Sequence, residues 1–229
     1  MSEQAPYDYI ADYYARVHEK NAAFPEIADF WLSGFRLVTG ARVLNLGCGP
    51  MFYDNLARFG DVPKTYVGVD LNEQTFAFLK NGDHPELIKH RKMAEAAGIE
   101  MSFVQGDAIA YLETQEAAFD TILGIGFFAT FSGETFKRLI SGCRRALVPG
   151  GTLLKMTWHG SIRTQAETAA KIKYRYDNEV EPAGEELVRE ITSLGFETAS
   201  DETFICPPDT IGWRSIQVAA FRKPLGDAT

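Results

Sequence analysis

The sequence predicts an α/β fold: a doubly wound, mostly parallel, seven-stranded sheet with a C-terminal antiparallel hairpin and a helical N-terminal lid. Two observations lead to this prediction. Short apolar runs without polar alternation recur along the chain, as expected for strands that are covered on both faces. Segments of helical length separate these runs, and alternation of strand with helix favours a parallel sheet. A chain of 229 residues has room for one such domain.

Four apolar runs are the predicted parallel strands of the first half, and each ends at or beside a Gly or Asp residue. They cover residues 41–46, 65–70, 101–107 and 119–126. A helix is expected over 85–98, because Pro85 suits its first turn and Gly98 suits its end. Its expected apolar side consists of Leu87, Ile88, Met93, Ala94 and Ala97. A further helix is expected over about 134–147.

The last third of the chain differs from the first half. A fifth strand is predicted over 150–158, followed by a helical stretch over 161–194. Two strand-like runs within 202–223 are joined by a Pro-rich loop, which indicates an antiparallel hairpin at the edge of the sheet. In a fold of this kind ligands bind outside the carboxyl ends of the parallel strands.

Composition narrows the classes of partner. The chain has 23 Lys and Arg residues against 31 Asp and Glu, a net charge of −8, which opposes binding to polyanions. We therefore expect neither nucleic acid nor a membrane as partner. The three cysteines lie far apart, with no metal-ligand spacing, which favours a reducing compartment and no bound metal. The longest nearly apolar run, 121–131, is too short to span a bilayer, and a cytoplasmic location is expected.

The most informative segment is VLNLGCGP, residues 43–50, in which a strand runs directly into Gly47-Cys48-Gly49. Glycines allow the backbone to turn sharply and to approach a ligand closely. Taken alone, the segment fits an ordinary strand-to-helix turn equally well. Asp70 ends the next strand, where an acidic side chain meets the ribose of a bound adenosine. Phe52 stands where the dinucleotide fingerprint needs Gly or Ala, which argues against a pyrophosphate cradle.

Four blocks in order resemble the class I S-adenosylmethionine-dependent methyltransferases of the small-molecule type. The blocks are VLNLGCGP, YVGVDLNEQ, FVQGDAIAYL and FDTILGIGFF, with RRALVPGGTLLK closing the core. The resemblance extends from about Tyr7 to Lys223, and YDYIADYY near the N-terminus resembles the first helix of such enzymes. It implies a lid over residues 1–40 and a Rossmann-like methyltransferase domain over 41–229. The implied cofactor is S-adenosyl-L-methionine, its product S-adenosyl-L-homocysteine, with no metal.

The resemblance also implies roles for individual residues. Gly47 and Gly49 would lie against the methionyl part of the cofactor, Asp70 on its ribose, and Asp107 at the adenine amino group. The full set of implied cofactor-binding residues is Asn45, Gly47, Cys48, Gly49, Asp70, Leu71, Asp107, Ala108, Gly124 and Ile125. The alternative for Asp70 and Asp107 is that each caps the helix that follows it.

Two positions depart from the family pattern. Asn45 stands where an acidic residue is usual, and Met51 stands where a third glycine is usual. An Asn side chain still accepts a hydrogen bond, but it supplies no charge opposite the cofactor's ammonium. A module that binds the cofactor without catalysis therefore remains an alternative.

The acceptor side is predicted from residues around the strand ends. His159 follows the fifth strand and is a candidate general base, the alternative being a pocket-wall residue without a proton role. Tyr14 is a second candidate catalytic residue. The candidate substrate-binding residues are Tyr13, Phe127, Phe128 and Trp158. The aromatic residues from Phe24 to Phe35 fit either a lid over the site or plain core.

The function expected from these residues is methyl transfer to a nitrogen or oxygen atom of a small aromatic or heteroaromatic metabolite. Aminopropyl transfer from decarboxylated S-adenosylmethionine is a further alternative. That reaction needs acidic residues after the fourth strand, where this chain reads GIGFFATF.

Overall fold

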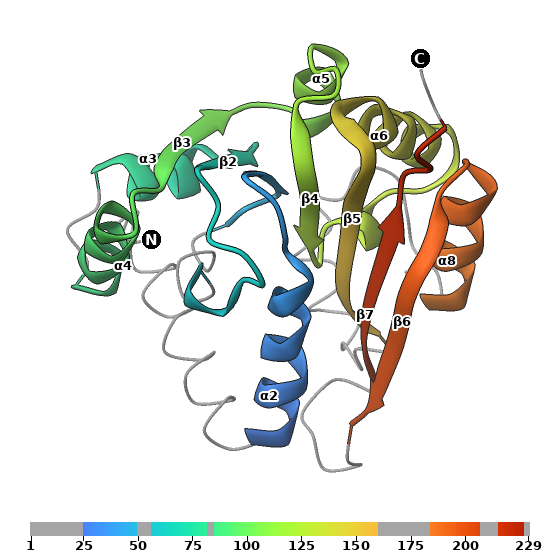
Figure 1. Cartoon of the computed structure of the whole chain (residues 1–229), viewed down its shortest axis with the longest axis horizontal. Helices are drawn as coiled ribbons and strands as arrows, with labels where there is room; N and C mark the ends of the chain where they lie inside the picture. Colours follow the sequence, from blue (N-terminus) through green and yellow to red (C-terminus); the bar gives the residue numbers. More distant parts are fainter. Residues whose placement is uncertain (1–24, 50–55, 82–84, 160–183, 207–214, 227–229) are drawn as a thin grey trace, which may run out of the picture.

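The computed structural model describes residues 25–49, 56–81, 85–159, 184–206 and 215–226. Within them lies a seven-stranded sheet in the order β3-β2-β1-β4-β5-β7-β6 (Figure 1). Its strands are β1 (Arg42–Leu46), β2 (Thr65–Asp70), β3 (Glu100–Gln105), β4 (Phe119–Ile125), β5 (Leu147–His159), β6 (Glu197–Ile205) and β7 (Ser215–Arg222). The first five strands are parallel, and β7 runs antiparallel to both β5 and β6. The predicted mostly parallel seven-stranded sheet with a C-terminal antiparallel hairpin is confirmed, whereas residues 1–24 of the predicted N-terminal lid lie outside the described residues.

Helices cover both faces of the sheet (Figure 1). They are α2 (Pro25–Gly34), α3 (Glu73–Asn81), α4 (Pro85–Ala96), α5 (Ala108–Glu113), α6 (Gly133–Ala146) and α8 (Gly184–Ser193), with short 3-10 turns η1 (Phe35–Leu37) and η3 (Phe128–Thr130). One apolar cluster joins α5, α6 and α8 to the sheet. A second cluster joins η1, α3 and α4 to the opposite face. Each strand of the centre is therefore buried on both sides, which explains its unalternating apolar sequence.

The observed elements differ from the expected ones mainly at their ends. Strand β5 begins three residues earlier than predicted, beside a register irregularity in its pairing with β4. On α4 the apolar side is narrower than predicted: Leu87 and Ala94 are buried, whereas Ile88 and Met93 are both 39% exposed. The prediction for these two side chains was wrong, because α4 touches the sheet along one narrow stripe.

Helix α2 packs on the sheet against β7, which lies between β5 and the edge strand β6. Phe35, just after the helix, is buried in the second cluster, and the Phe30 ring lies 5.5 Å from that of Phe204. A Cβ on Gly34 would lie 2.9 Å from a methyl carbon of Val218, so this helix approaches β7 closely. In this part of the N-terminal segment the aromatic side chains contribute to the core.

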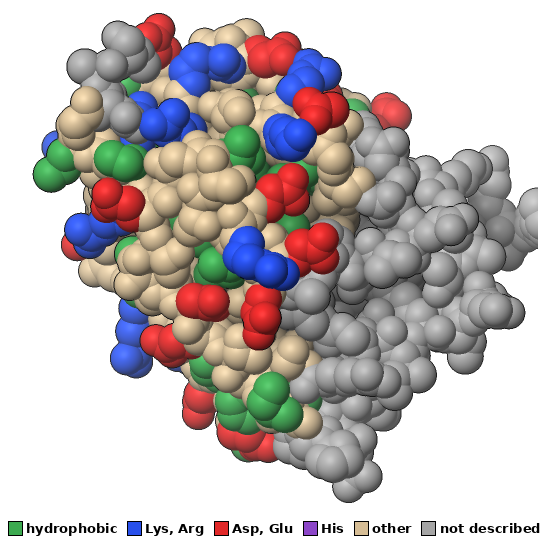
Figure 2. Space-filling model, turned by 90° about the vertical axis from the view of Figure 1, so that its right-hand side faces the viewer, with side chains coloured by type: hydrophobic (Ala, Val, Ile, Leu, Met, Phe, Trp, Pro, Cys, Tyr) green, Lys and Arg blue, Asp and Glu red, His purple; other side chains and the backbone are tan. Residues whose placement is uncertain are grey.

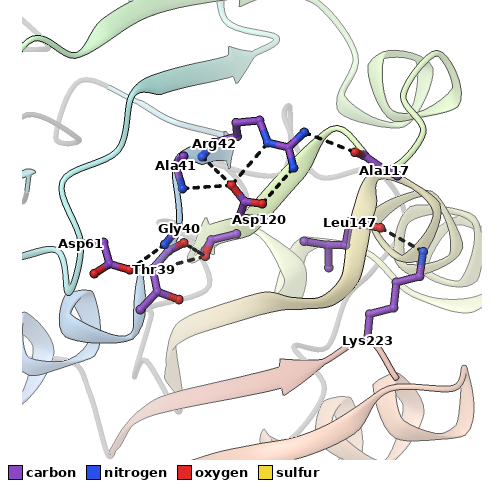
Figure 3. Close-up of polar contacts among 10 residues, drawn as sticks. Thr39, Gly40, Ala41, Arg42, Asp61, Ala117, Asp120, Leu147 and Lys223 are labelled. Atoms are coloured by element: carbon purple, nitrogen blue, oxygen red, sulfur yellow. Dashed lines mark hydrogen bonds and ion pairs between the residues drawn. The ribbon is translucent and has the colours of Figure 1, made fainter. Parts of the chain in front are cut away.

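A polar cluster fixes the amino-terminal edge of β1 and β4 (Figure 3). Asp120 accepts hydrogen bonds from the backbone N–H groups of Ala41 and Arg42 at 2.9 and 2.8 Å. The Arg42 guanidinium adds an ion pair at 2.9 Å. Burial opposes ionisation of Asp120, but the hydrogen bonds from Arg42 outweigh it and lower the pKa of the carboxyl group. The register of β1 against β4 is thus pinned at the end opposite to the expected ligand site.

The described surface shows no single-sign field on the side where α8 and β6 lie. Figure 2 shows acidic and basic side chains interspersed there.

Among the described helices, none is long and apolar enough to cross a membrane. Cys48, Cys143 and Cys206 are buried free thiols.

Candidate functional site

The parallel register brings the ends of three strands together. Leu46, the last residue of β1, pairs with Val69 of β2 on one side and with Gly124 of β4 on the other. The segments that follow these strands therefore leave the sheet at the same edge. The motifs predicted to bind the cofactor lie in those segments.

The glycine loop after β1 has a backbone that favours glycine. Gly47 and Gly49 adopt positive φ angles of 61° and 50°. A Cβ on Gly47 would lie 2.5 Å from a ring carbon of Phe127, whereas the space around Gly49 is open. Gly47 is therefore required by both its conformation and its neighbour, and Gly49 by its conformation.

Asp70 ties the glycine loop to the end of β2. Its Oδ2 accepts the Gly49 N–H at 3.0 Å, and its Oδ1 accepts the Asn72 N–H at 2.8 Å. Burial raises the pKa of the Asp70 carboxyl group, and these two hydrogen bonds offset part of that rise. The cap of α3 comes from Asn72, whose side-chain oxygen accepts the Gln74 N–H at 2.9 Å. Asp70 is thus placed at the strand end with acceptor lone pairs remaining for a diol.

Two further predicted adenosine contacts have different settings. Leu71 follows Asp70 and is 56% exposed, so its side chain is accessible to the face of a purine. Asp107 caps α5, because its Oδ1 accepts the Ala110 N–H at 2.8 Å. The alternative that Asp107 is a helix cap therefore holds for this oxygen. The predicted contact with an adenine amino group would come in addition to this cap. Ala108 begins α5 and is buried.

Asn45 and Cys48 face the interior. Asn45 is fully buried, and neither polar atom of its amide has a hydrogen-bond partner in the described part of the chain. An unpaired buried amide costs free energy, so this group is suited to a polar ligand atom or an ordered water. The Cys48 thiol is also buried. Burial is the main cause that raises its pKa, and the negative charge of Asp70 is the second. Any contact of Cys48 with a cofactor would therefore come from its backbone.

The end of β4 carries the aromatic pair predicted to line the acceptor pocket. The Phe127 ring lies over Gly47 and 4.9 Å from the ring of Phe131. Phe128 is fully buried, and a Cβ on Gly124 would lie 2.6 Å from its ring. In this conformation Phe127 lies at the glycine loop, whereas Phe128 packs in the core. Ile125, the last residue of β4, is partly buried.

The remaining predicted acceptor-side residues are described only in part. Tyr13 and Tyr14 lie outside the described residues. Trp158 and His159 end β5, opposite Ile216 and Ser215 of β7, and only their backbone is described. Among the described residues no group of three or more His, Cys, Asp or Glu side chains is placed to hold a metal ion.

Sequence reasoning missed a polar group inside the sheet. Lys155 of β5 is fully buried and hydrogen-bonds Gln217 of β7, which in turn bonds Asp201 of β6. Burial lowers the pKa of Lys155 to about 8, against an opposing attraction from Asp201. The available signal was a single lysine within the apolar run TLLKMTW.

Comparison with known proteins agrees with this geometry. Residues 43–151 match the family model described as a methyltransferase domain. No curated protein sequence matches the chain. The segment 43–151 that matches the family model includes the glycine loop, Asp70, Asp107 and the whole of β4.

Solved structures share the fold at low identity. An S-adenosylmethionine-dependent methyltransferase from Archaeoglobus fulgidus is 16% identical, with 89% of this chain and 94% of that chain covered and a TM-score of 0.57. The 1,6-didemethyltoxoflavin N1-methyltransferase of Burkholderia thailandensis is 18% identical, with 98% and 92% covered and a TM-score of 0.56. A phosphoethanolamine N-methyltransferase of Haemonchus contortus is 18% identical, with 86% and 52% covered and a TM-score of 0.56.

The last two structures contain S-adenosylhomocysteine together with a small-molecule substrate. The strand order, the matched family model and the four motif blocks lead to one assignment. Residues 43–151 match a methyltransferase domain, and the described chain has the fold of the class I S-adenosylmethionine-dependent methyltransferases.

Proposed function

We propose that the chain transfers the methyl group of S-adenosyl-L-methionine to a nitrogen or oxygen atom of a small aromatic or heteroaromatic metabolite. The observation that carries the proposal is the Asp70 carboxylate, held by the Gly49 and Asn72 N–H groups beside a positive-φ glycine loop. Two structural neighbours, which were solved with bound 1,6-didemethyltoxoflavin and with bound phosphomonomethylethanolamine, support a small acceptor.

The cofactor supplies an activated methyl group on a sulfonium, so the protein's contribution is mainly alignment. Asp70 would accept hydrogen bonds from the ribose, and the loop at Gly47 and Gly49 would let the methionyl part approach the backbone. Phe127 lies against that loop, where its ring would exclude water from a bound sulfonium and attract the positive charge.

Acceptor recognition falls to the residues at the ends of β4 and β5 and in the N-terminal segment. His159 is the proposed general base and Tyr14 a second proposed catalytic group. Tyr13, Trp158 and Phe128 complete the proposed acceptor side, with Phe128 acting from within the core. A base is needed only where the acceptor atom carries a proton that it must lose.

Replacement of Asp70 by Ala tests the cofactor site. We expect the Kd for S-adenosylhomocysteine to rise roughly 30- to 150-fold, because a charge-assisted contact to the ribose is worth about 2–3 kcal/mol. Asp61→Ala is the matched control, since Asp61 bonds the Gly40 N–H at the opposite edge of the sheet. Calorimetry measures both. An unchanged Kd in Asp70→Ala would remove the adenosine site from this edge.

Turnover decides between the proposal and a non-catalytic binder. Incubation with methyl-labelled cofactor and a metabolite extract should give a labelled small molecule and S-adenosylhomocysteine. If the protein binds the cofactor but yields no product in any extract, the alternative of a non-catalytic cofactor-binding module is supported. The uncharged Asn45 side chain is the feature that suggests this alternative. Aminopropyl transfer would instead need decarboxylated cofactor, and no acidic residue lies between Ile125 and Phe131.

A further inference from the structure

Lys155 occupies an unusual position for a lysine. It lies within β5, is fully buried, and pairs with Gly124 of β4 and Ala219 of β7. Alternate residues of a strand share a face, so Leu153, Lys155 and Thr157 face the same side of the sheet. Leu153 and Ala219 belong to the apolar cluster on the α6 and α8 side. The ammonium group therefore enters the sheet face that carries α6 and α8.

The partner of Lys155 is held in one orientation. Lys155 Nζ donates to Gln217 Oε1 at 2.5 Å, and Gln217 Nε2 donates to Asp201 Oδ1 at 2.7 Å. Because the carboxylate only accepts, it fixes which end of the amide faces Lys155. Gln217 is the one hydrogen-bond partner of Lys155 among the described residues, and an ammonium group has three N–H donors.

A second polar group lies beside the first. The Thr157 side chain is two residues nearer the carboxyl end of β5 and is 2% exposed. Its hydroxyl has no hydrogen-bond partner in the part of the chain that the structure describes. Thr157 pairs directly with Gln217 on β7, so the hydroxyl, the amide and the ammonium form one polar group.

This polar group adjoins the candidate methyltransferase site. Gly124, the neighbour of Lys155 on β4, has the Phe128 ring packed where its side chain would be. Adjacent strands are about 4.8 Å apart, so the backbone of Lys155 lies one strand away from the position against which that ring packs. Phe128 in turn contacts Phe127, with ring centres 5.8 Å apart, and Phe127 lies on the glycine loop. Thr157 and Lys155 are two and four residues from the carboxyl end of β5, on the sheet face that carries Phe127 and Phe128.

We propose that Lys155 and Thr157 recognise an anionic group of the methyl acceptor, which makes the acceptor a small aromatic or heteroaromatic acid. The inference rests on the proposed methyl transfer and names its substrate class. A buried ammonium with one hydrogen-bond partner among the described residues is costly, and an anion beside it would offset that cost by a charge-assisted hydrogen bond. Thr157 would donate a second hydrogen bond to the same group. A neutral ring would add no charge opposite the ammonium.

The test compares probes that differ only in charge. The full-length protein, loaded with S-adenosylhomocysteine, is titrated with benzoate and benzamide, and with nicotinate and nicotinamide. Each carboxylate should bind at least tenfold more tightly than its amide. Lys155→Met should abolish that preference, and Thr157→Val should reduce it. Lys92→Met, which removes an exposed lysine of α4, should retain it.

Proton linkage gives an independent readout. The pKa of Lys155 is lowered to about 8, so part of the amine is neutral at pH 8, and an anion would draw a proton onto it. Calorimetry at pH 8 in buffers of different ionisation enthalpy should show uptake of roughly half a proton per carboxylate bound, absent in Lys155→Met. Asp201 is a charged group that raises the pKa of Lys155. Asp201→Asn should therefore leave more of the amine neutral at pH 8 and increase the proton uptake. This increase should be smaller than the decrease caused by Lys155→Met.

The outcomes separate the two proposals. Unchanged S-adenosylhomocysteine affinity in Lys155→Met shows that the variant is folded and that the cofactor site is intact. If the loaded wild type does not prefer carboxylates, or if Lys155→Met keeps the preference, the acidic acceptor is wrong while methyl transfer stands. If the wild type binds no S-adenosylhomocysteine, the proposed function fails, and this inference fails with it.

Discussion

At the scale of single residues, glycine is needed at positions 47 and 49 for different physical reasons. Gly47 and Gly49 share the left-handed backbone conformation, in which an L side chain is strained. Only Gly47 also has a neighbour in the way, the ring of Phe127. Conformation and packing can therefore be separated by substituting the two positions in turn.

Gly49→Ala should lower the free energy of unfolding by about 1 kcal/mol, the cost of a left-handed alanine. Gly47→Ala should cost about 1–3 kcal/mol more, because the new methyl group overlaps the Phe127 ring. Urea unfolding measures both. Gly47→Ala placed in a Phe127→Ala background should fall to the cost of Gly49→Ala. Equal costs in the wild-type background would contradict the contact.

Some site residues could be predicted from the sequence and others could not. Gly47 and Asp70 were identifiable because each immediately follows or ends an apolar run, and strand ends meet at one edge. The role of Lys155 was not identifiable, because it depends on Gln217 and Asp201, far along the chain. Ile88 was misplaced, since an apolar residue on a helix does not reveal how wide the buried stripe is.

At the scale of elements, β1 and β4 are joined at their amino-terminal ends by Asp120. This carboxylate receives two backbone N–H groups and the Arg42 guanidinium. Backbone N–H groups at a strand start that lose their acceptor must find water or stay unpaired. The cluster thus holds β1 in the register that places the glycine loop beside β4.

Asp120→Ala should lower the free energy of unfolding by about 1–3 kcal/mol, since it orphans these donors. The lowered pKa of Asp120 adds a pH dependence. A carboxyl group whose folded-state pKa is depressed stabilises above its unfolded pKa, near 4, and loses that effect as pH falls through the folded value. Wild type should therefore lose more stability than Asp120→Ala between pH 5 and about pH 2. Parallel acid profiles would refute this role.

Elements were more predictable where burial is simple. Strand β2 has the predicted bounds because both of its faces are covered and Asp70 ends it. The C-terminal hairpin was recognisable, but β6 begins at Glu197, earlier than expected. As an edge strand it is polar and largely exposed, so its sequence lacks the apolar pattern on which such predictions depend.

At the scale of the whole molecule, different parts of the sheet serve stability and the candidate site. The apolar clusters on its two faces supply stability, and the ends of β1, β2 and β4 supply the candidate cofactor site. Lys155 is an exception, since it places an ionisable group in the middle of the stabilising layer. A residue that lowers fold stability is expected where function requires it.

The final prediction concerns the stability of the whole fold against pH. An unfolded lysine titrates near pH 10.5, whereas Lys155 in the fold titrates near 8, so between these values the unfolded chain holds a proton that the folded chain lacks. Stability contributed by this group must therefore rise from pH 8 to 10.5, by about 3 kcal/mol in total. Below pH 8 the buried charge imposes its full cost, and Lys155→Met should be the more stable protein by about 1–3 kcal/mol, less the loss of the bond to Gln217. Cys48 and Cys143 also have raised pKa values, so the quantity to measure is the difference between wild type and Lys155→Met in urea unfolding from pH 7 to 10.5. That difference should shrink as pH rises. A difference that stays constant with pH would show that Lys155 keeps an ordinary pKa, and that its ammonium is solvated in the folded protein.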